Sequence, residues 1–253
     1  MPLSFWDYAN IGRPQWRGQK DLARKPTWFL LGAPDIHTRV RNTHVINVVE
    51  RLPMPIDAKI LDAGCGRAVA FFYLTRRHPD WQLTGLELDD EMVDSCQKTA
   101  SAGSYNNLKF IQTTINELSE ETAYNLVLCI DVLEHIPDDV GLLRRIYHAL
   151  VPGGYLVLHV PRRGSEQWRF WPGFNEHGVE SHVREEYRQE ELQQRFEQAG
   201  FKILELNQTF GRAAEIGFEI NHTFERNWTL RQIVAILTHP LTLPLAYGDT
   251  RHY

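Results

Sequence analysis

The stretch LDAGCGRA, residues Leu61–Ala68, decides the fold of this 253-residue chain. It places Gly64 and Gly66 between a short hydrophobic run and a segment with helical spacing. Glycine at such a position lets the backbone approach a ligand closely, and the N-terminus of the next helix offers free N–H groups. The stretch is therefore either a turn that holds a nucleotide-like cofactor or a tight structural corner.

Strand and helix patterns alternate on both sides of this turn. Hydrophobic runs predict strands at residues 58–64, 81–88, 107–113, 124–131, 155–161 and 201–207. Helical spacing and end signals predict helices at residues 45–52, 69–79, 89–100, 137–154 and 188–200. Such alternation is typical of an α/β fold with a doubly wound, mostly parallel sheet that helices cover on both faces.

The ends of the chain differ from this core. We expect an N-terminal arm and cap over residues 1–44, a core over residues 45–208 and a C-terminal decoration over residues 209–253. The first 35 residues are rich in Trp, Pro, Gly and Arg without periodicity, which predicts an irregular arm whose tryptophans need cover. A seventh strand either comes from residues 210–220 or is absent.

Composition and charge limit the binding partners and the cellular compartment that we expect for this chain. A formal net charge of −5 without a long basic run argues against nucleic acid as a partner. The N-terminus lacks the basic start and apolar stretch of a secretory signal, and the three cysteines are scattered, as reduced thiols are. We therefore expect a cytoplasmic protein without a metal site.

An acid downstream supports the cofactor interpretation of the turn. Glu87 ends the second predicted strand, at about the spacing at which an acid accepts hydrogen bonds from ribose hydroxyls. The alternatives are a purely structural turn with a solvated Glu87, and dinucleotide binding. The dinucleotide fingerprint G-x-G-x-x-G would need glycine where this chain has Val69, so that fingerprint is incomplete.

Four ordered motifs resemble the class I S-adenosylmethionine-dependent methyltransferases. They are ILDAGCGRA, LTGLELDDEMV, LVLCIDVLEHIPD and LVPGGYLVLHVP, and the resemblance covers Ala58 to about Glu205. It implies a Rossmann-like fold, S-adenosyl-L-methionine as the cofactor and methyl transfer as the activity. The rival interpretations are a non-catalytic subunit that binds the same cofactor and an NAD-dependent oxidoreductase.

The resemblance also implies which residues hold the cofactor. Asp62, Gly64 and Gly66 would surround the methionine moiety, Glu87 would bind the ribose and Leu88 would pack on the adenine. The other expected contacts are Ala63, Cys65, Thr114, Ile115 and Ile130. Thr114 stands where the family often has an acid for the adenine amine, so that contact is expected to pass to a backbone group.

A hydroxyl acceptor would benefit from a base, and histidine suits that task. Asp131 and His135 follow the fourth predicted strand, and His177 and His182 lie in the loop before the helix at 188–200. His135 and His182 are the first candidates for the base, with Asp131 beside them; the alternative for His135 is a packing role. His159, on the fifth predicted strand, is expected to be satisfied within the sheet.

The variable segments shape the acceptor site. The acceptor is expected to be a small molecule, a sugar or a lipid-type compound, and the sequence decides neither the methylated atom nor the oligomeric state. Residues 227–247 are apolar enough to cap the acceptor pocket or to contact a membrane peripherally, although such a stretch more often forms the core of a decoration.

Overall fold

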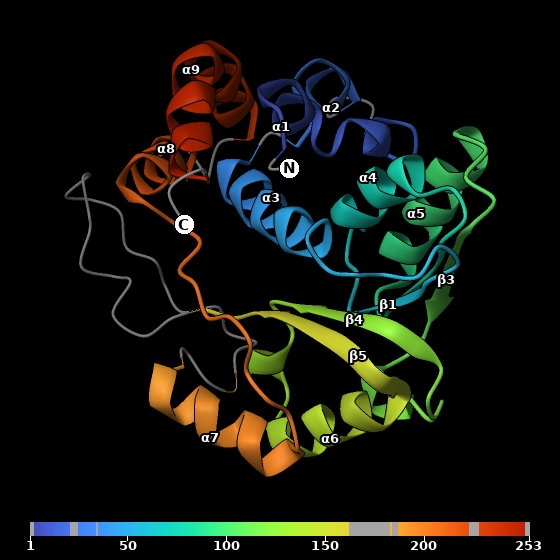
Figure 1. Cartoon of the computed structure of the whole chain (residues 1–253). Helices are drawn as coiled ribbons and strands as arrows, with labels where there is room; N and C mark the ends of the chain where they lie inside the picture. Colours follow the sequence, from blue (N-terminus) through green and yellow to red (C-terminus); the bar gives the residue numbers. More distant parts are fainter. Residues whose placement is uncertain are drawn as a thin grey trace.

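In the computed structural model of the chain, five parallel strands form one sheet in the order β3-β2-β1-β4-β5 (Figure 1). The structure describes residues 3–20, 25–33, 35–161, 183, 187–222 and 228–250. The strands are β1 (Lys59–Ala63), β2 (Gln82–Glu87), β3 (Leu108–Gln112), β4 (Tyr124–Ile130) and β5 (Leu150–His159). The predicted doubly wound α/β fold is confirmed, and its order changes direction between β1 and β4, where such folds bind ligands.

Helices cover both faces of this sheet. One layer holds α3 (Ile36–Val49), α4 (Val69–Arg77) and α5 (Asp90–Ala102), and the other holds α6 (Asp139–Ala149) and α7 (Gln189–Ala199) (Figure 1). The remaining elements are α1 (Phe5–Asn10), η1 (Arg13–Trp16), α2 (Lys25–Leu31), η2 (Ile115–Glu117), η3 (Leu133–His135), α8 (Arg212–His222) and α9 (Trp228–Asp249).

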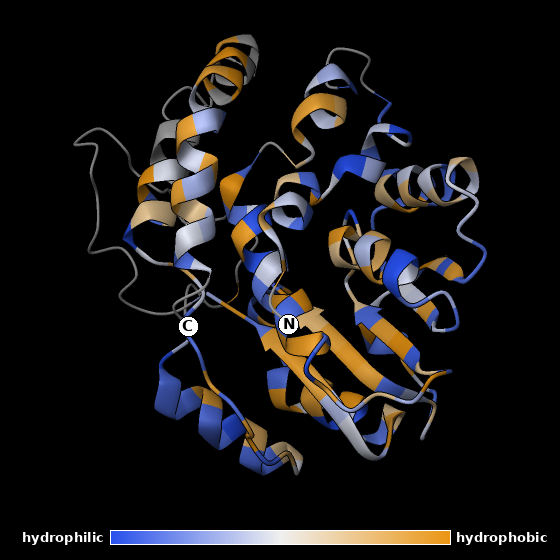
Figure 2. Cartoon of the chain, turned by 45° about the horizontal axis from the view of Figure 1, so that its top comes forward, coloured by the Kyte–Doolittle hydropathy of each residue, from blue (hydrophilic) through white to orange (hydrophobic). Residues whose placement is uncertain are grey.

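Alternating side chains of the central strands feed two separate cores. Along β4, Leu126 and Leu128 join the core under α3, α4 and α5, whereas Val127 and Cys129 join the core over α6 and α7. All four are fully buried, as expected for a parallel strand covered on both faces. Figure 2 shows these strands as a hydrophobic layer in the middle of the molecule.

One predicted strand is wrong, and the seventh strand does not come from residues 210–220. Residues 201–207 have no regular structure. Both sides of this segment are exposed, one through Leu204 and Leu206 and the other through Glu205 and Asn207. Pairing with the sheet would therefore bury little apolar surface. Residues 212–222 form α8, where Ala214 and Gly217 are buried at helical spacing. No strand follows β5 among the described residues.

The N-terminal arm is helical rather than irregular. Ser4 caps α1 by accepting from the Asp7 N–H, and Asp35 caps α3 by accepting from the N–H groups of His37 and Thr38. α3 therefore begins at Ile36, nine residues before the predicted Val45 start, and it runs across the predicted boundary at residue 44. Of the tryptophans expected to need cover, Trp28 is buried, Trp16 is half-buried and Trp6 is exposed.

The two ends of the chain pack on each other above α3. The buried Arg39 guanidinium donates to the carbonyls of Tyr8 and Ala9 (2.8 and 3.0 Å), which ties α3 to the C-terminal end of α1. The Tyr247 hydroxyl donates to the Leu3 carbonyl (2.7 Å), and Asp249 accepts from the Ala214 N–H (2.7 Å). α1, α2, α8 and α9 thus form one cap beside the sheet (Figure 1).

Gly85 gives a direct test of this packing. A Cβ at this position in β2 would lie 2.8 Å from Cys65 Sγ and 2.9 Å from Phe110 Cδ1, so we expect Gly85→Ala to lower the free energy of unfolding by about 1–3 kcal/mol. Urea unfolding followed by circular dichroism measures it. Gly248→Ala, where a Cβ meets no atom within 4 Å, is the control and should lose no stability. Equal stability of the two variants would contradict this account of the β2 packing.

Candidate functional site

A cavity of about 930 Å³ opens at the carboxyl ends of β1, β2 and β4. The sheet side is formed by the glycine turn after β1, the end of β2 and the segments that follow β3 and β4. The opposite side is formed by α2 and the first turns of α3, through Trp28, Ala33, Asp35, Thr38, Arg41 and Asn42. The cavity therefore lies where the strand order changes direction, between a sheet edge and the N-terminal cap.

The turn after β1 is built from left-handed residues. Gly64 has a φ of +89°, Gly66 of +50° and Ala68 of +50°. A Cβ on Gly64 would lie 2.5 Å from Val132 Cγ2, so this position requires glycine on both conformational and steric grounds. A Cβ on Gly66 would meet no atom within 4 Å, and Gly66 lines the cavity. The turn thus presents bare backbone to open space.

Glu87 joins the end of β2 to this turn. Its Oε2 accepts from the Gly66 N–H (2.8 Å), and its Oε1 accepts from the N–H groups of Leu88 (2.8 Å) and Asp89 (3.0 Å). An ionised carboxylate has about four lone-pair sites, so these three bonds orient the group and leave it able to accept again. Glu87 is thereby fixed at the edge of the cavity.

Asp62 is a buried carboxyl at the floor of the cavity. Its Oδ1 is buried without a hydrogen-bond partner among the described residues. Burial raises the pKa of Asp62 to about 7, although the positive charge of Arg41 opposes the shift and the negative charge of Glu87 adds to it. A buried acceptor with no partner is costly, so its position at a cavity wall indicates that a ligand's donor group belongs there.

The other predicted cofactor contacts occupy different environments. Leu88 is 69% exposed on the cavity wall, where its side chain offers an apolar surface to a ligand. Thr114 accepts from the Asn116 N–H and caps η2, so its hydroxyl is partly occupied. Cys65, Ile115 and Ile130 also line the cavity, whereas Ala63 is fully buried in β1 and lies outside the lining.

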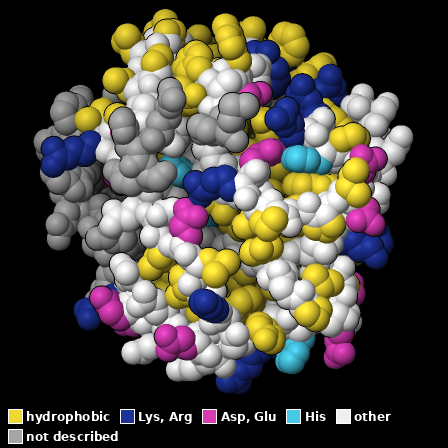
Figure 3. Space-filling view, viewed as in Figure 1, with side chains coloured by type: hydrophobic (Ala, Val, Ile, Leu, Met, Phe, Trp, Pro, Cys, Tyr) yellow, Lys and Arg dark blue, Asp and Glu magenta, His cyan; other side chains and the backbone are white. Residues whose placement is uncertain are grey.

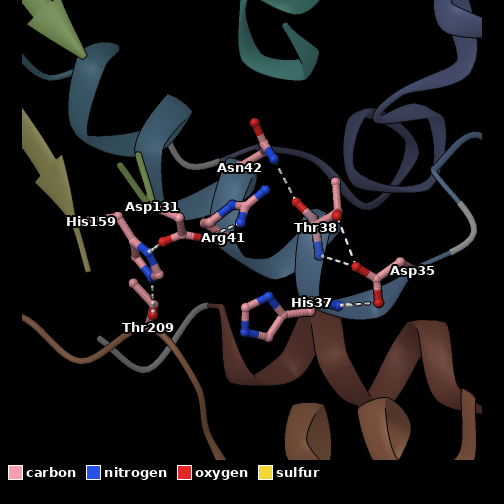
Figure 4. A network of polar contacts seen from close by, with 8 residues as sticks. All are labelled: Asp35, His37, Thr38, Arg41, Asn42, Asp131, His159 and Thr209. Atoms are coloured by element: carbon pink, nitrogen blue, oxygen red, sulfur yellow. Dashed lines mark hydrogen bonds and ion pairs between the residues drawn. The ribbon is translucent and has the colours of Figure 1, made fainter. Parts of the chain in front are cut away.

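Asp131 is the centre of a charged network between the sheet and α3 (Figure 4). Its carboxylate contacts the Arg41 guanidinium and His159 Nδ1, and His159 Nε2 lies 3.0 Å from Thr209 Oγ1. Burial alone would raise the pKa of Asp131, but the hydrogen bond from His159 and the charge of Arg41 outweigh it, and the pKa lies below its ordinary value. His159 is thus satisfied within the fold, as predicted.

The backbone of Asp131 is also unusual, since its φ is +53°. Left-handed non-glycine residues cost energy and gather at functional sites. Asp131 faces the cavity together with His135, which lies on η3. The other predicted histidines, His177 and His182, lie outside the described residues.

The sequence did not predict the cavity wall that lies opposite the glycine turn and the strand ends. Thr38, Arg41 and Asn42 line the cavity from one face of α3, at positions that the predicted helix at 45–52 left out. The sequence signal was Asp35, an N-cap residue directly before apolar Ile36 and Val40 at helical spacing.

Comparison with known proteins supports the interpretation of this site. Residues 37–206 match a family model described as a methyltransferase domain. A relative from Acinetobacter baumannii (strain AYE), the ubiquinone biosynthesis O-methyltransferase, is 26% identical over 144 residues, which are 54% of this chain and 60% of the relative. The match thus spans well under two thirds of the relative's length.

Solved structures share the fold. The YcgJ protein from Bacillus subtilis matches with a TM-score of 0.51 and 21% identity, covering 62% of this chain and 67% of its own. The [4+2]-cyclase SpnF matches with a TM-score of 0.57 and 17% identity, covering 81% of this chain and 77% of its own.

The pKa of Asp62 gives a test of the cavity floor. Because the folded chain binds this proton more tightly than the unfolded chain, the proton stabilises the fold fully below about pH 4, and this contribution is lost as the pH rises through about 7. Asp62→Asn lacks that contribution. The free energy of unfolding of the variant minus that of the wild type should therefore rise by about 2 kcal/mol from pH ~5 to pH ~8. Urea titrations at both pH values measure it, and a constant difference would refute the assignment.

Proposed function

The chain belongs to the methyltransferase family whose model matches residues 37–206, and from this premise we propose that it transfers the methyl group of S-adenosylmethionine to a hydroxyl of a small-molecule acceptor. The observation that carries the proposal is the 2.8 Å bond between the Gly66 N–H and Glu87 Oε2 at the edge of one cavity. It joins the bare glycine backbone and the ribose-binding acid in a single site. The O-methyltransferase relative supports oxygen as the methylated atom.

The residues present fit the cofactor. The unpartnered Oδ1 of Asp62 suits the ammonium of a methionine moiety. The positive charge of that ammonium would favour the ionised form of the Asp62 carboxyl. Gly66 leaves room for a ligand, Glu87 keeps a free acceptor site for ribose hydroxyls, and exposed Leu88 offers an apolar surface to the adenine. When bound, S-adenosylmethionine supplies a methyl group on a positively charged sulfur, a good leaving group for in-line displacement.

The acceptor is positioned from the opposite wall. Arg41 binds Asp131 through one guanidinium nitrogen. The Asn42 side-chain amide donates to the Thr38 carbonyl (2.7 Å), and no described residue donates to its oxygen, which can accept from a ligand. These groups can orient a polar acceptor, and alignment to within roughly 3–3.5 Å of the reacting atom supplies most of the catalysis such a reaction needs.

Asp131 and His135 have different roles in the proposed proton transfer. The lowered pKa of Asp131 makes it a weak base, so we assign it to accepting a hydrogen bond that orients the acceptor hydroxyl. His135 is the proposed base, since it lies on the same cavity wall and its imidazole can take the hydroxyl proton as the oxygen–carbon bond forms. His182 stays a second candidate from the sequence alone.

The rival functions are less well supported. An NAD-dependent oxidoreductase would need a third glycine near the pyrophosphate, but Val69 is buried as the first residue of α4. The [4+2]-cyclase likeness concerns the fold alone, and one fold hosts many reactions. A non-catalytic cofactor-binding subunit would bind the cofactor without turning over any acceptor.

Cofactor binding is tested by calorimetric titration of S-adenosylmethionine and S-adenosylhomocysteine. Glu87→Gln removes the charge that accepts the ribose hydroxyls, so we expect the dissociation constant to rise about 10- to 100-fold. Glu91→Gln, an exposed acid on α5 outside the cavity, is the matched control and should bind as the wild type does. No binding by the wild type would reject the proposal.

Catalysis is tested with a panel of phenolic, sugar and lipid hydroxyl compounds and a methyl-transfer assay. Once one acceptor turns over, His135→Asn should lower kcat by about 10²- to 10⁴-fold while the affinity for the cofactor stays unchanged. Full activity in His135→Asn would exclude it as the base. Cofactor binding without turnover of any compound would favour the non-catalytic subunit.

A further inference from the structure

Helix α9 carries a hydrophobic stripe on its outer face. Leu237 and Leu241 are 71% and 72% exposed, and they belong to a stripe that runs along four turns of the helix. Its members are Leu230, Ile233, Ile236, Leu237, Leu241 and Leu245. The inner face buries Ala246 together with polar His239 and Thr242, and Leu243 and Tyr247 pack against the core. A helix whose outer face met water would carry polar residues on that face, so the exposed stripe indicates that something apolar covers it.

The N-terminal helices next to α9 also expose hydrophobic side chains. α1 and α2 both contact α9, and they carry exposed Trp6, Phe29 and Leu30. Figure 3 shows hydrophobic side chains gathered over α9 and α2 at the top of the molecule. We call this set, the stripe on α9 with Trp6, Phe29 and Leu30, the apolar cap face.

Basic side chains border the apolar cap face. Arg13 donates to the Leu30 carbonyl (3.0 Å), so its guanidinium lies next to the exposed end of α2. Arg17 is exposed directly after η1, and Lys25 begins α2. Dark blue Lys and Arg side chains lie beside the hydrophobic ones in Figure 3. The border thus complements a negatively charged surface.

We propose that the apolar cap face binds the surface of a membrane that contains anionic phospholipids, with α9 lying in the plane of the interface. Interfacial helices combine an aliphatic face with flanking bases and tryptophan, as this face does. No described helix is long and apolar enough to cross a membrane.

A protein partner fits this face less well. The sequence of α9 has Arg231 and Asp249 as its charged residues, and its outer stripe is Leu and Ile throughout. Protein interfaces favour aromatic residues and Arg in their centres, surrounded by a polar rim that makes hydrogen bonds. Hydrocarbon, in contrast, requires no hydrogen-bonding group from the helix. Trp28, which lines the cavity, shares α2 with Phe29 and Leu30, so the membrane would lie beside the cavity.

Flotation with lipid vesicles tests the proposal on the full chain without cofactor or acceptor, so its outcome is independent of the proposed function. The vesicles are phosphatidylcholine alone and phosphatidylcholine mixed with phosphatidylglycerol. We expect the wild type to float with the mixed vesicles, less with the neutral ones, and less as salt is added. The double variant Leu237→Gln/Leu241→Gln should bind at least ~10-fold more weakly, because each leucine loses its burial in hydrocarbon.

Leu204→Gln is the matched control, since Leu204 is 71% exposed and lies outside the apolar cap face. It should float as the wild type does, and thermal unfolding should show all three proteins folded. Equal flotation of the wild type and the double variant would overturn the proposal, as would the absence of flotation. Absence of flotation together with a wild-type dimer that the double variant converts to a monomer would assign the face to a second copy of the chain instead.

Discussion

The carboxylate of Glu87 is the constraint on which the site depends. It accepts three backbone N–H groups from two separate segments, the glycine turn after β1 and the loop after β2. The parallel pairing of β1 with β2 brings both segments to one sheet edge, and the Gly64 and Cys65 N–H groups fix the turn further by donating to the Leu86 carbonyl. The same acid therefore shapes the turn and faces the ligand, so the cavity edge is preorganised by bonds within the chain.

The sheet and its cofactor edge were predictable because they are encoded locally. Leu126 and Leu128 alternate with Val127 and Cys129 between two cores, and a run that is hydrophobic at every position can satisfy both. Left-handed backbone favours glycine, so Gly64 and Gly66 are recognisable from the sequence. Residues 201–207 also form a hydrophobic run, but they have no partner strand in the part of the chain that the structure describes. Strand pairing involves two segments, so one segment alone cannot predict it.

The acceptor wall and the charged network depend on contacts between distant segments. The charged network joins four distant segments: α3 with Arg41, the end of β4 with Asp131, the end of β5 with His159, and the segment before α8 with Thr209. No local sequence pattern links these residues. The same holds for α9, whose apolar sequence favours the core of a decoration over a membrane contact. The packing of distant segments decides which of its side chains are covered, and Leu241 is exposed while His239 is buried.

Charge in the cavity connects the cofactor half to the acceptor half. The lining contains five carboxylates, those of Asp35, Asp62, Glu87, Asp89 and Asp131, against the guanidinium groups of Arg41 and Arg67. Such an excess stabilises a cation more than a neutral ligand. Asp62 adjusts this balance, because with a pKa of about 7 it can hold a proton when no cation is near and release it when one binds. Under the proposed function, the sulfonium of the cofactor loses its positive charge on methyl transfer. The acid-rich cavity therefore favours the reactant cofactor over the product. Once the ligand leaves, uptake of a proton by Asp62 would reduce the negative charge of the empty cavity.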